Sequence, residues 1–356
     1  MPFSFALRDI DFAKATQQEI NQLALSIEHD PELKFIHFTD IDLGVFNFVQ
    51  METMLAAIKN NKATQTISLS RCCLENASSE CLNLLSTYLK SKRTLDISFH
   101  SLKKPGPWLD FIKDVLDGEL EFLEFSYNWI GLLDNNANLQ KLFCLFANSN
   151  LNKLLLRGNI IGSNDCKQAL LNLFSGKIKY LDLADNLLGC SSGTKPKDWN
   201  EFFDMLQKNK FLKGLNLTDC GLDLLTFPEE YGDDDEDYIE TDNVFSMRLL
   251  MFVKQTSLEE LNLSKNDFTE SFTIKLIEAA HENPRLKFVC EDNGLSKEAI
   301  AALTQTLKEK SQSAAGGHEP SSMKSLLTFS DPLKAVENQD NGSVVSPQAF
   351  RKIGSQ

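Results

Sequence analysis

Few side chains of this 356-residue sequence stand at the spacings that enzyme chemistry requires. The five histidines fall in separate stretches and form no H-E-x-x-H or other metal-binding pattern. The glycines form no phosphate-binding or dinucleotide-binding loop, and no serine lies in a G-x-S-x-G turn. We therefore expect no catalytic residue, no metal site and no bound cofactor.

The eight cysteines offer thiol chemistry but lack the sequence neighbours that would activate it. None has an adjacent histidine, and no C-x-x-C pair occurs. Six fall where a buried residue is expected, namely Cys72, Cys81, Cys144, Cys166, Cys220 and Cys290. We interpret them as reduced core thiols of a protein that works in a reducing cytosol.

Recognition chemistry is concentrated in the middle of the chain. Aromatic residues recur there beside cations and carboxylates, which is the composition of protein interfaces. The candidate protein-binding residues are Phe122, Glu124, Tyr127, Lys153, Leu155, Arg157, Tyr180, Asp182, Asp185 and Asn216. Whether they form one surface depends on the elements that position them.

Two stretches of the chain share a frame that defines those elements. Leu151 to Gly162 reads LNKLLLRGNIIG, and Ile178 to Gly189 reads IKYLDLADNLLG. Both fit L-x-x-L-x-L-x-x-N-x-Φ-G, where Φ is apolar. Leu154 and Leu156 alternate with exposed positions, which predicts a short strand with one buried face. Asn159 then follows at the turn, where its amide can bond unpaired backbone groups, and a helix comes next.

The frame recurs along most of the chain. Its turn residues are Ile10, Ile41, Cys72, His100, Asn128, Asn159, Asn186, Cys220, Asn266 and Asn293. They are about 27 to 46 residues apart and give about ten repeats. We expect the asparagine ladder to be interrupted where isoleucine or histidine stands, with cysteine as a small, burial-tolerant substitute. The last copy, LKFVCEDNGLS, is one residue short and has Glu291 at a core position, so we interpret it as a terminal cap.

This frame resembles the leucine-rich repeat, and its spacing is similar to that of ribonuclease-inhibitor-like members, over about residues 3 to 310. The resemblance implies a right-handed α/β solenoid, or horseshoe, with a parallel β-sheet on the concave face and helices on the convex face. We expect residues 1–310 to form this solenoid and residues 311–356, rich in small polar residues, to form a disordered C-terminal tail. The leucines expected to point inward are Leu154, Leu156, Leu181, Leu183, Leu215, Leu217, Leu261 and Leu263.

In such a solenoid the candidate residues lie on the concave sheet, mostly in repeats five to seven. Its central column is expected to run Ala6, His37, Ser68, Asp96, Glu124, Leu155, Asp182, Asn216 and Asn262. We therefore predict a non-enzymatic scaffold that binds a protein through this face. Two alternatives stay open. Phe122 and Tyr180 stack on each other across neighbouring strands without binding anything, or Arg157 is the inserted arginine of a GTPase-activating protein that regulates a small GTPase.

The charge of the chain narrows the class of partner. The formal net charge of −14 and the isoelectric point near 4.9 disfavour nucleic acid and anionic membrane surfaces. Charged residues within the first fifteen positions argue against a secretory signal. An acidic insertion near residues 224–243 contains EEYGDDDEDYIETD, whose nine carboxylates predict a solvated loop. We expect a monomer that binds another protein.

The composition, rich in Asn, Lys and Phe, resembles that of leucine-rich repeat effectors that intracellular bacteria deliver by type IV secretion. This resemblance implies a virulence role in the host-cell cytosol, with a host protein as the partner. The alternative is an ordinary cytoplasmic adaptor of the organism that makes the chain.

Overall fold

The computed structural model describes residues 3–6, 14–38, 42–43, 48–133, 136–163, 166–189, 196–225, 238–299 and 301–302. The predicted tail at 311–356, the turn residues Ile10 and Ile41, and Cys190 lie outside the described residues.

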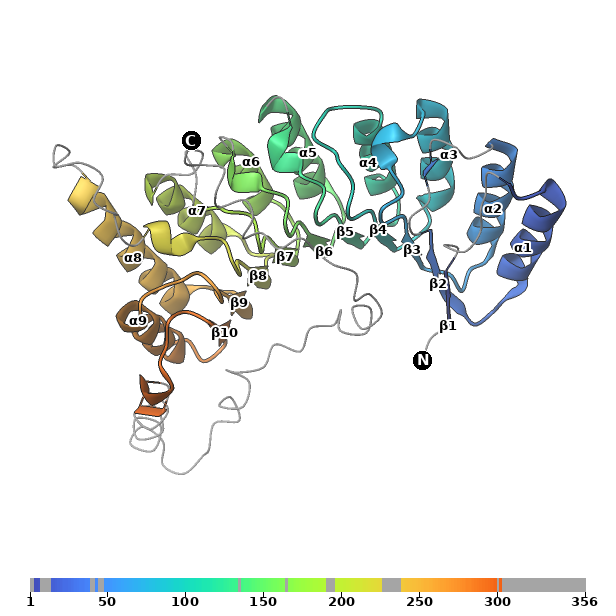
Figure 1. Ribbon diagram of the computed structural model, residues 1–356. Helices are drawn as coiled ribbons and strands as arrows, with labels where there is room; N and C mark the ends of the chain where they lie inside the picture. Colours follow the sequence, from blue (N-terminus) through green and yellow to red (C-terminus); the bar gives the residue numbers. More distant parts are fainter. Residues whose placement is uncertain are drawn as a thin grey trace. The chain divides into compact units, whose positions relative to one another are not determined.

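Ten short strands alternate with helices along the described chain and form one parallel sheet in sequence order (Figure 1). The strands are β1 (Phe3–Ala6), β2 (Leu33–His37), β3 (Thr66–Ser68), β4 (Thr94–Asp96), β5 (Phe122–Glu124), β6 (Lys153–Leu155), β7 (Tyr180–Asp182), β8 (Gly214–Asn216), β9 (Glu260–Asn262) and β10 (Lys287–Val289). The α-helices are α1 (Gln17–His29), α2 (Phe48–Asn60), α3 (Ser79–Leu89), α4 (Trp108–Leu116), α5 (Asn136–Asn148), α6 (Lys167–Phe174), α7 (Pro196–Lys208), α8 (Tyr238–Gln255) and α9 (Glu270–His281). The helices lie on one side of the sheet in Figure 1, and we call the opposite side the open sheet face. This is the predicted α/β solenoid.

Local sequence signals set where several helices begin. Thr16 caps α1 by accepting a hydrogen bond from the Glu19 amide, while the Glu19 carboxylate accepts one from the Thr16 amide. The side chains of Ser78 and Thr269 cap α3 and α9 by accepting a hydrogen bond from a backbone amide in the first helical turn. Pro107 immediately precedes α4, because proline is tolerated at a helix start and not further in.

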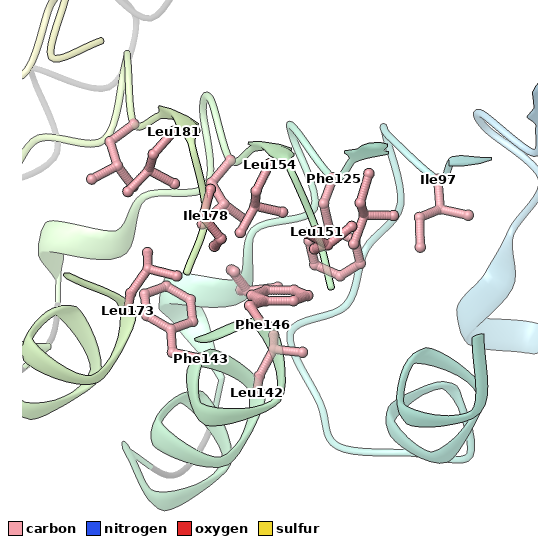
Figure 2. Close-up of a cluster of buried hydrophobic side chains, with 14 of the residues drawn as sticks. Ile97, Phe125, Leu142, Phe143, Phe146, Leu151, Leu154, Leu173, Ile178 and Leu181 are labelled. Atoms are coloured by element: carbon pink, nitrogen blue, oxygen red, sulfur yellow. The ribbon is translucent and has the colours of Figure 1, made fainter. Parts of the chain in front are cut away.

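The core fills the space between the sheet and the helices. All eight leucines predicted to point inward are buried, with exposed fractions of 3% or less. Figure 2 shows Phe125, which directly follows β5, and Leu154 of β6 on the side of the sheet that faces Phe143 and Phe146 of α5. One repeat leaves both its strand face and its helix face uncovered, so each repeat is stabilised by its neighbours.

The asparagine turn residues form a buried ladder at the ends of the strands. The side-chain oxygen of Asn159 accepts a hydrogen bond from the Asn128 amide at 2.9 Å. Its side-chain nitrogen donates to the carbonyls of Phe125 and Leu156 at 2.8 and 2.9 Å. Asn186 makes the same set of bonds one repeat later. Each amide therefore satisfies backbone groups at the bend and links two repeats.

His100 replaces an asparagine of the ladder only in part, in line with the predicted interruption. Its Nδ1 accepts a hydrogen bond from the Leu74 amide at 3.0 Å. The side-chain oxygen of Asn186 does the same for the amide of Ile161 at 3.3 Å. The Cys72 amide, which an asparagine side chain would accept at this position, instead donates to the Leu69 carbonyl at 3.2 Å, and His100 Nε2 makes no hydrogen bond among the described residues. The imidazole therefore supplies only one of the bonds of an asparagine amide.

The cysteine turn residues supply the donor half. The Cys220 thiol donates to the Leu183 carbonyl at 3.2 Å, and the Cys72 thiol donates to the Phe38 carbonyl. Asparagine side chains bond the equivalent carbonyl, three residues before the previous turn residue, in other repeats. A small, buried thiol can therefore stand at this position.

The sequence predicted that the acidic stretch is a solvated loop, but part of the stretch is helical. α8 begins at Tyr238, so residues 238–242 of the stretch are helical. Residues 226–237 lie outside the described part of the chain.

The last repeat keeps its core register, and the expectation for Glu291 was wrong. Phe288 pairs with Leu261 of β9, and Cys290 is buried at the next inward position. Glu291 is exposed. The missing residue therefore falls before β10 and moves no polar side chain into the core.

Candidate protein-binding surface

The sheet register places the candidate residues together on the open sheet face. Across β5 to β8 one row contains, in order, Phe122, Lys153 and Tyr180. The neighbouring row contains Glu124, Leu155, Asp182 and Asn216. The remaining three follow the strand ends of β5, β6 and β7, and are Tyr127, Arg157 and Asp185. The order predicted for the central column, Ala6 to Asn262, agrees with the strand register.

Lys153 separates the two aromatic residues of the first row. Its Nζ lies 5.0 Å from the centre of the Phe122 ring, a cation–π contact. The Tyr180 ring instead covers Gly214 of the next strand, where an added Cβ would lie 2.6 Å from the ring. The alternative that Phe122 and Tyr180 stack directly on each other is therefore wrong, because β6 lies between their strands. Tyr180 is 39% exposed.

The central column has a structural task that the sequence did not reveal. The Ser, Asp, Glu and Asn side chains of the column each accept a hydrogen bond from the backbone amide two residues later. This bond is 3.0 Å long from Glu124 to the Ser126 amide, 2.8 Å from Asp182 to Ala184 and 3.1 Å from Asn216 to Thr218. Asp96 and Asn262 do the same. These polar side chains therefore stabilise the strand exit as well as facing the open side.

Burial changes the protonation of the column. Burial raises the pKa of Glu124 to about 8, and the nearby Asp96 adds to the effect. Burial also raises the pKa of Asp182 above its ordinary value. Leu155, between them, is only 5% exposed. Glu124 is thus largely uncharged at neutral pH, and Leu155 offers little surface to a partner.

Arg157 is anchored beside the column. Its Nε lies 3.7 Å from a carboxylate oxygen of Asp185, and its backbone amide donates to the Ser126 hydroxyl at 3.1 Å. Burial raises the pKa of Asp185, and Arg157 counteracts part of that rise. The side chain lies beyond the carboxyl end of β6 and is 44% exposed. The GTPase-activating alternative stays an untested prediction.

Sequence reasoning missed a second set of exposed side chains beside the ladder. Phe99, Trp129, Leu132 and Leu187 are each 37% to 40% exposed. Three of them flank a turn residue directly and have positive φ, at 62° for Phe99, 59° for Trp129 and 54° for Leu187. The available signal was their position, one residue before or after the ladder residue of the frame.

Neither the thiols nor metal ligands form a site in the described part of the chain. No disulfide and no group of three metal-ligating side chains occurs among the residues described. Burial raises the pKa of Cys81 to about 11 and of Cys290 to about 12, so both stay thiols. Cys144 is half-buried, whereas the frame had placed it in the core. None of the described helices has the length and hydropathy of a membrane span.

Comparison with known proteins gives the fold. No protein-family model matches the sequence, and no curated protein is similar to it. The chain is similar in structure to the leucine-rich repeat-containing protein LegL7 from Legionella pneumophila, with a TM-score of 0.58 and 19% sequence identity. The similarity covers 86% of this chain and 90% of LegL7. Together with the repeat frame and the parallel sheet, it shows that this chain has a leucine-rich repeat fold.

Proposed function

We propose that this protein is a non-enzymatic scaffold that binds another protein through the open sheet face of β5 to β8. The observation that carries the proposal is the solvent-facing row of Phe122, Lys153 and Tyr180 beside the anchored Arg157. Aromatic and arginine side chains dominate binding energy at protein interfaces. Tyr180 is 39% exposed in this row, and an exposed aromatic side chain beside cations is the kind of group that anchors a protein partner.

The test is affinity capture from a eukaryotic host-cell lysate with the full chain and matched variants. Tyr180→Ala and Arg157→Ala should each weaken binding of the captured protein by about 2 kcal/mol while leaving the melting temperature unchanged. Met247→Ala, which removes an exposed side chain of α8, is the control and should bind normally. Unchanged affinity in both sheet variants would move the interface to the helices and contradict the proposal.

The finer proposal is that the chain is a bacterial effector delivered into the host cytosol. The support is the resemblance in composition together with the repeat array, and the predicted tail after Lys310 would carry the export signal. A chain ending at Lys310 should melt like the full chain and bind the same protein, yet fail to reach the host cytosol in a translocation reporter assay. Normal delivery of the shortened chain would remove this role from the tail.

A further inference from the structure

The residues on both sides of the ladder residues have left-handed backbone conformations, except at His100, where only the preceding Phe99 does. The positive φ values run through the repeats, for example 58° at Tyr127 and 59° at Trp129, on the two sides of Asn128. This conformation costs a residue with a Cβ about 1–2 kcal/mol, whereas glycine adopts it freely. The later repeats mostly use residue types that tolerate it, namely Asp219, Gly221, Asp267, Asp292 and Gly294.

Repeats three to five place bulky side chains at these costly positions instead. The residues are Arg71, Phe99, Tyr127 and Trp129. Nothing in the backbone favours aromatic or long side chains there, and glycine would be more stable. Backbone strain of this kind persists where the side chain itself has a task.

Three of these side chains form a continuous stack just beyond the carboxyl ends of β3, β4 and β5. We call it the edge stack. The Arg71 guanidinium lies 4.9 Å from the centre of the Phe99 ring. The Phe99 and Tyr127 rings are stacked, with centroids 4.7 Å apart and planes 15° apart. The Tyr127 ring then covers Gly158, where an added Cβ would lie 2.3 Å from it. Any other residue at this position would displace the ring.

A second cation covers a second aromatic ring beyond the carboxyl ends of β4 and β5. Lys103 Nζ lies 3.9 Å from the centre of the Trp129 ring. Among the described residues, neither Arg71 nor Lys103 forms an ion pair with a carboxylate, although acidic residues outnumber basic residues in the chain. Their nitrogen donors are therefore available above an apolar base. Arginine and lysine on an aromatic support present those donors to carboxylates.

We propose that the edge stack, with Lys103 and Trp129, binds an acidic segment of a partner protein that also carries apolar side chains. Carboxylates of the segment meet Arg71 and Lys103, and its apolar groups pack on Phe99 and Trp129. The inference rests on the proposed function and names the chemistry of the partner. It also runs against the net charge of −14, which by itself would attract a basic partner.

The test is selection of random twelve-residue peptides displayed on phage by the immobilised full chain. We expect the enriched peptides to combine Asp or Glu with aromatic or aliphatic residues. The double variant Arg71→Glu/Lys103→Glu should lose this enrichment and weaken the best peptide about tenfold in fluorescence anisotropy. Lys177→Glu/Lys210→Glu makes the same change of net charge at exposed positions elsewhere and should leave selection unchanged.

Three results would overturn the inference: enrichment of Lys and Arg by the unmodified chain, acidic enrichment that survives in the Arg71→Glu/Lys103→Glu variant, or no enrichment. Any of these together with a lysate partner that still depends on Tyr180 would leave the proposed function standing. If the lysate partner does not depend on Tyr180 and peptide selection does not depend on Arg71 and Lys103, both proposals are wrong.

Discussion

Single side chains on the open sheet face combine structural and recognition tasks, and Glu124 shows the conflict most clearly. Its carboxylate accepts the Ser126 amide at the strand exit, yet burial raises its pKa to about 8 from the ordinary 4.5. Between these pH values the Glu124 carboxyl group is ionised in the unfolded chain and protonated in the folded chain. The contribution of Glu124 to stability is therefore complete below pH 4.5 and is lost as the pH rises through 8. Glu124→Gln keeps the acceptor oxygen and removes this dependence. The free energy of unfolding of the variant should rise relative to the unmodified chain by about 1 to 3 kcal/mol from pH 5 to pH 8 in urea titrations. A difference that does not change with pH would contradict the buried, protonated state of Glu124. The sequence predicted the register of this column, because the frame repeats faithfully. It did not predict the raised pKa, which depends on how closely Leu155 and the neighbouring strands enclose the carboxyl group.

The repeating element is the strand, the turn residue and the helix behind them, and its turn has a testable backbone cost. Trp129 adopts φ 59° and contacts Lys103. Trp129→Gly and Trp129→Ala both remove the ring, but only alanine still pays for the left-handed conformation. The glycine variant should therefore be more stable than the alanine variant by about 1 kcal/mol in chemical denaturation. Equal stability, or a more stable alanine variant, would show that the turn does not hold this conformation in solution. The frame predicted the strands and the inward leucines, since periodicity is a local signal. It missed the edge stack, because left-handed positions are usually marked by Gly, Asn or Asp, and here Phe, Tyr and Trp occupy them. The frame also indicated that His100 cannot replace asparagine fully, but not that its Nδ1 accepts from the Leu74 amide, which depends on where that amide points.

At the scale of the whole molecule, charge is unevenly distributed and the average is a poor guide to the partner. Nine of the carboxylates are in one stretch near α8, whereas Arg71 and Lys103 stand without ion pairs at the sheet edge of the described repeats. Composition predicted which classes of partner are disfavoured. The cations that lie on aromatic rings could be found only from the arrangement of the strands, which brings them together. Exposed apolar side chains also occur on the helix side, including Phe48 of α2 and Met247 of α8. The central question is therefore which side of the solenoid the partner contacts.

Site-specific photo-crosslinking answers that question most directly. The photoreactive residue p-benzoylphenylalanine would replace Tyr180 on the open sheet face, or Met247 on the exposed side of α8, one position per protein. Both positions are exposed, so neither replacement should disturb the core. After irradiation in host-cell lysate, we expect the Tyr180 position to form a covalent adduct with the partner and the Met247 position to form none. Adducts from Met247 alone would contradict binding through the open sheet face.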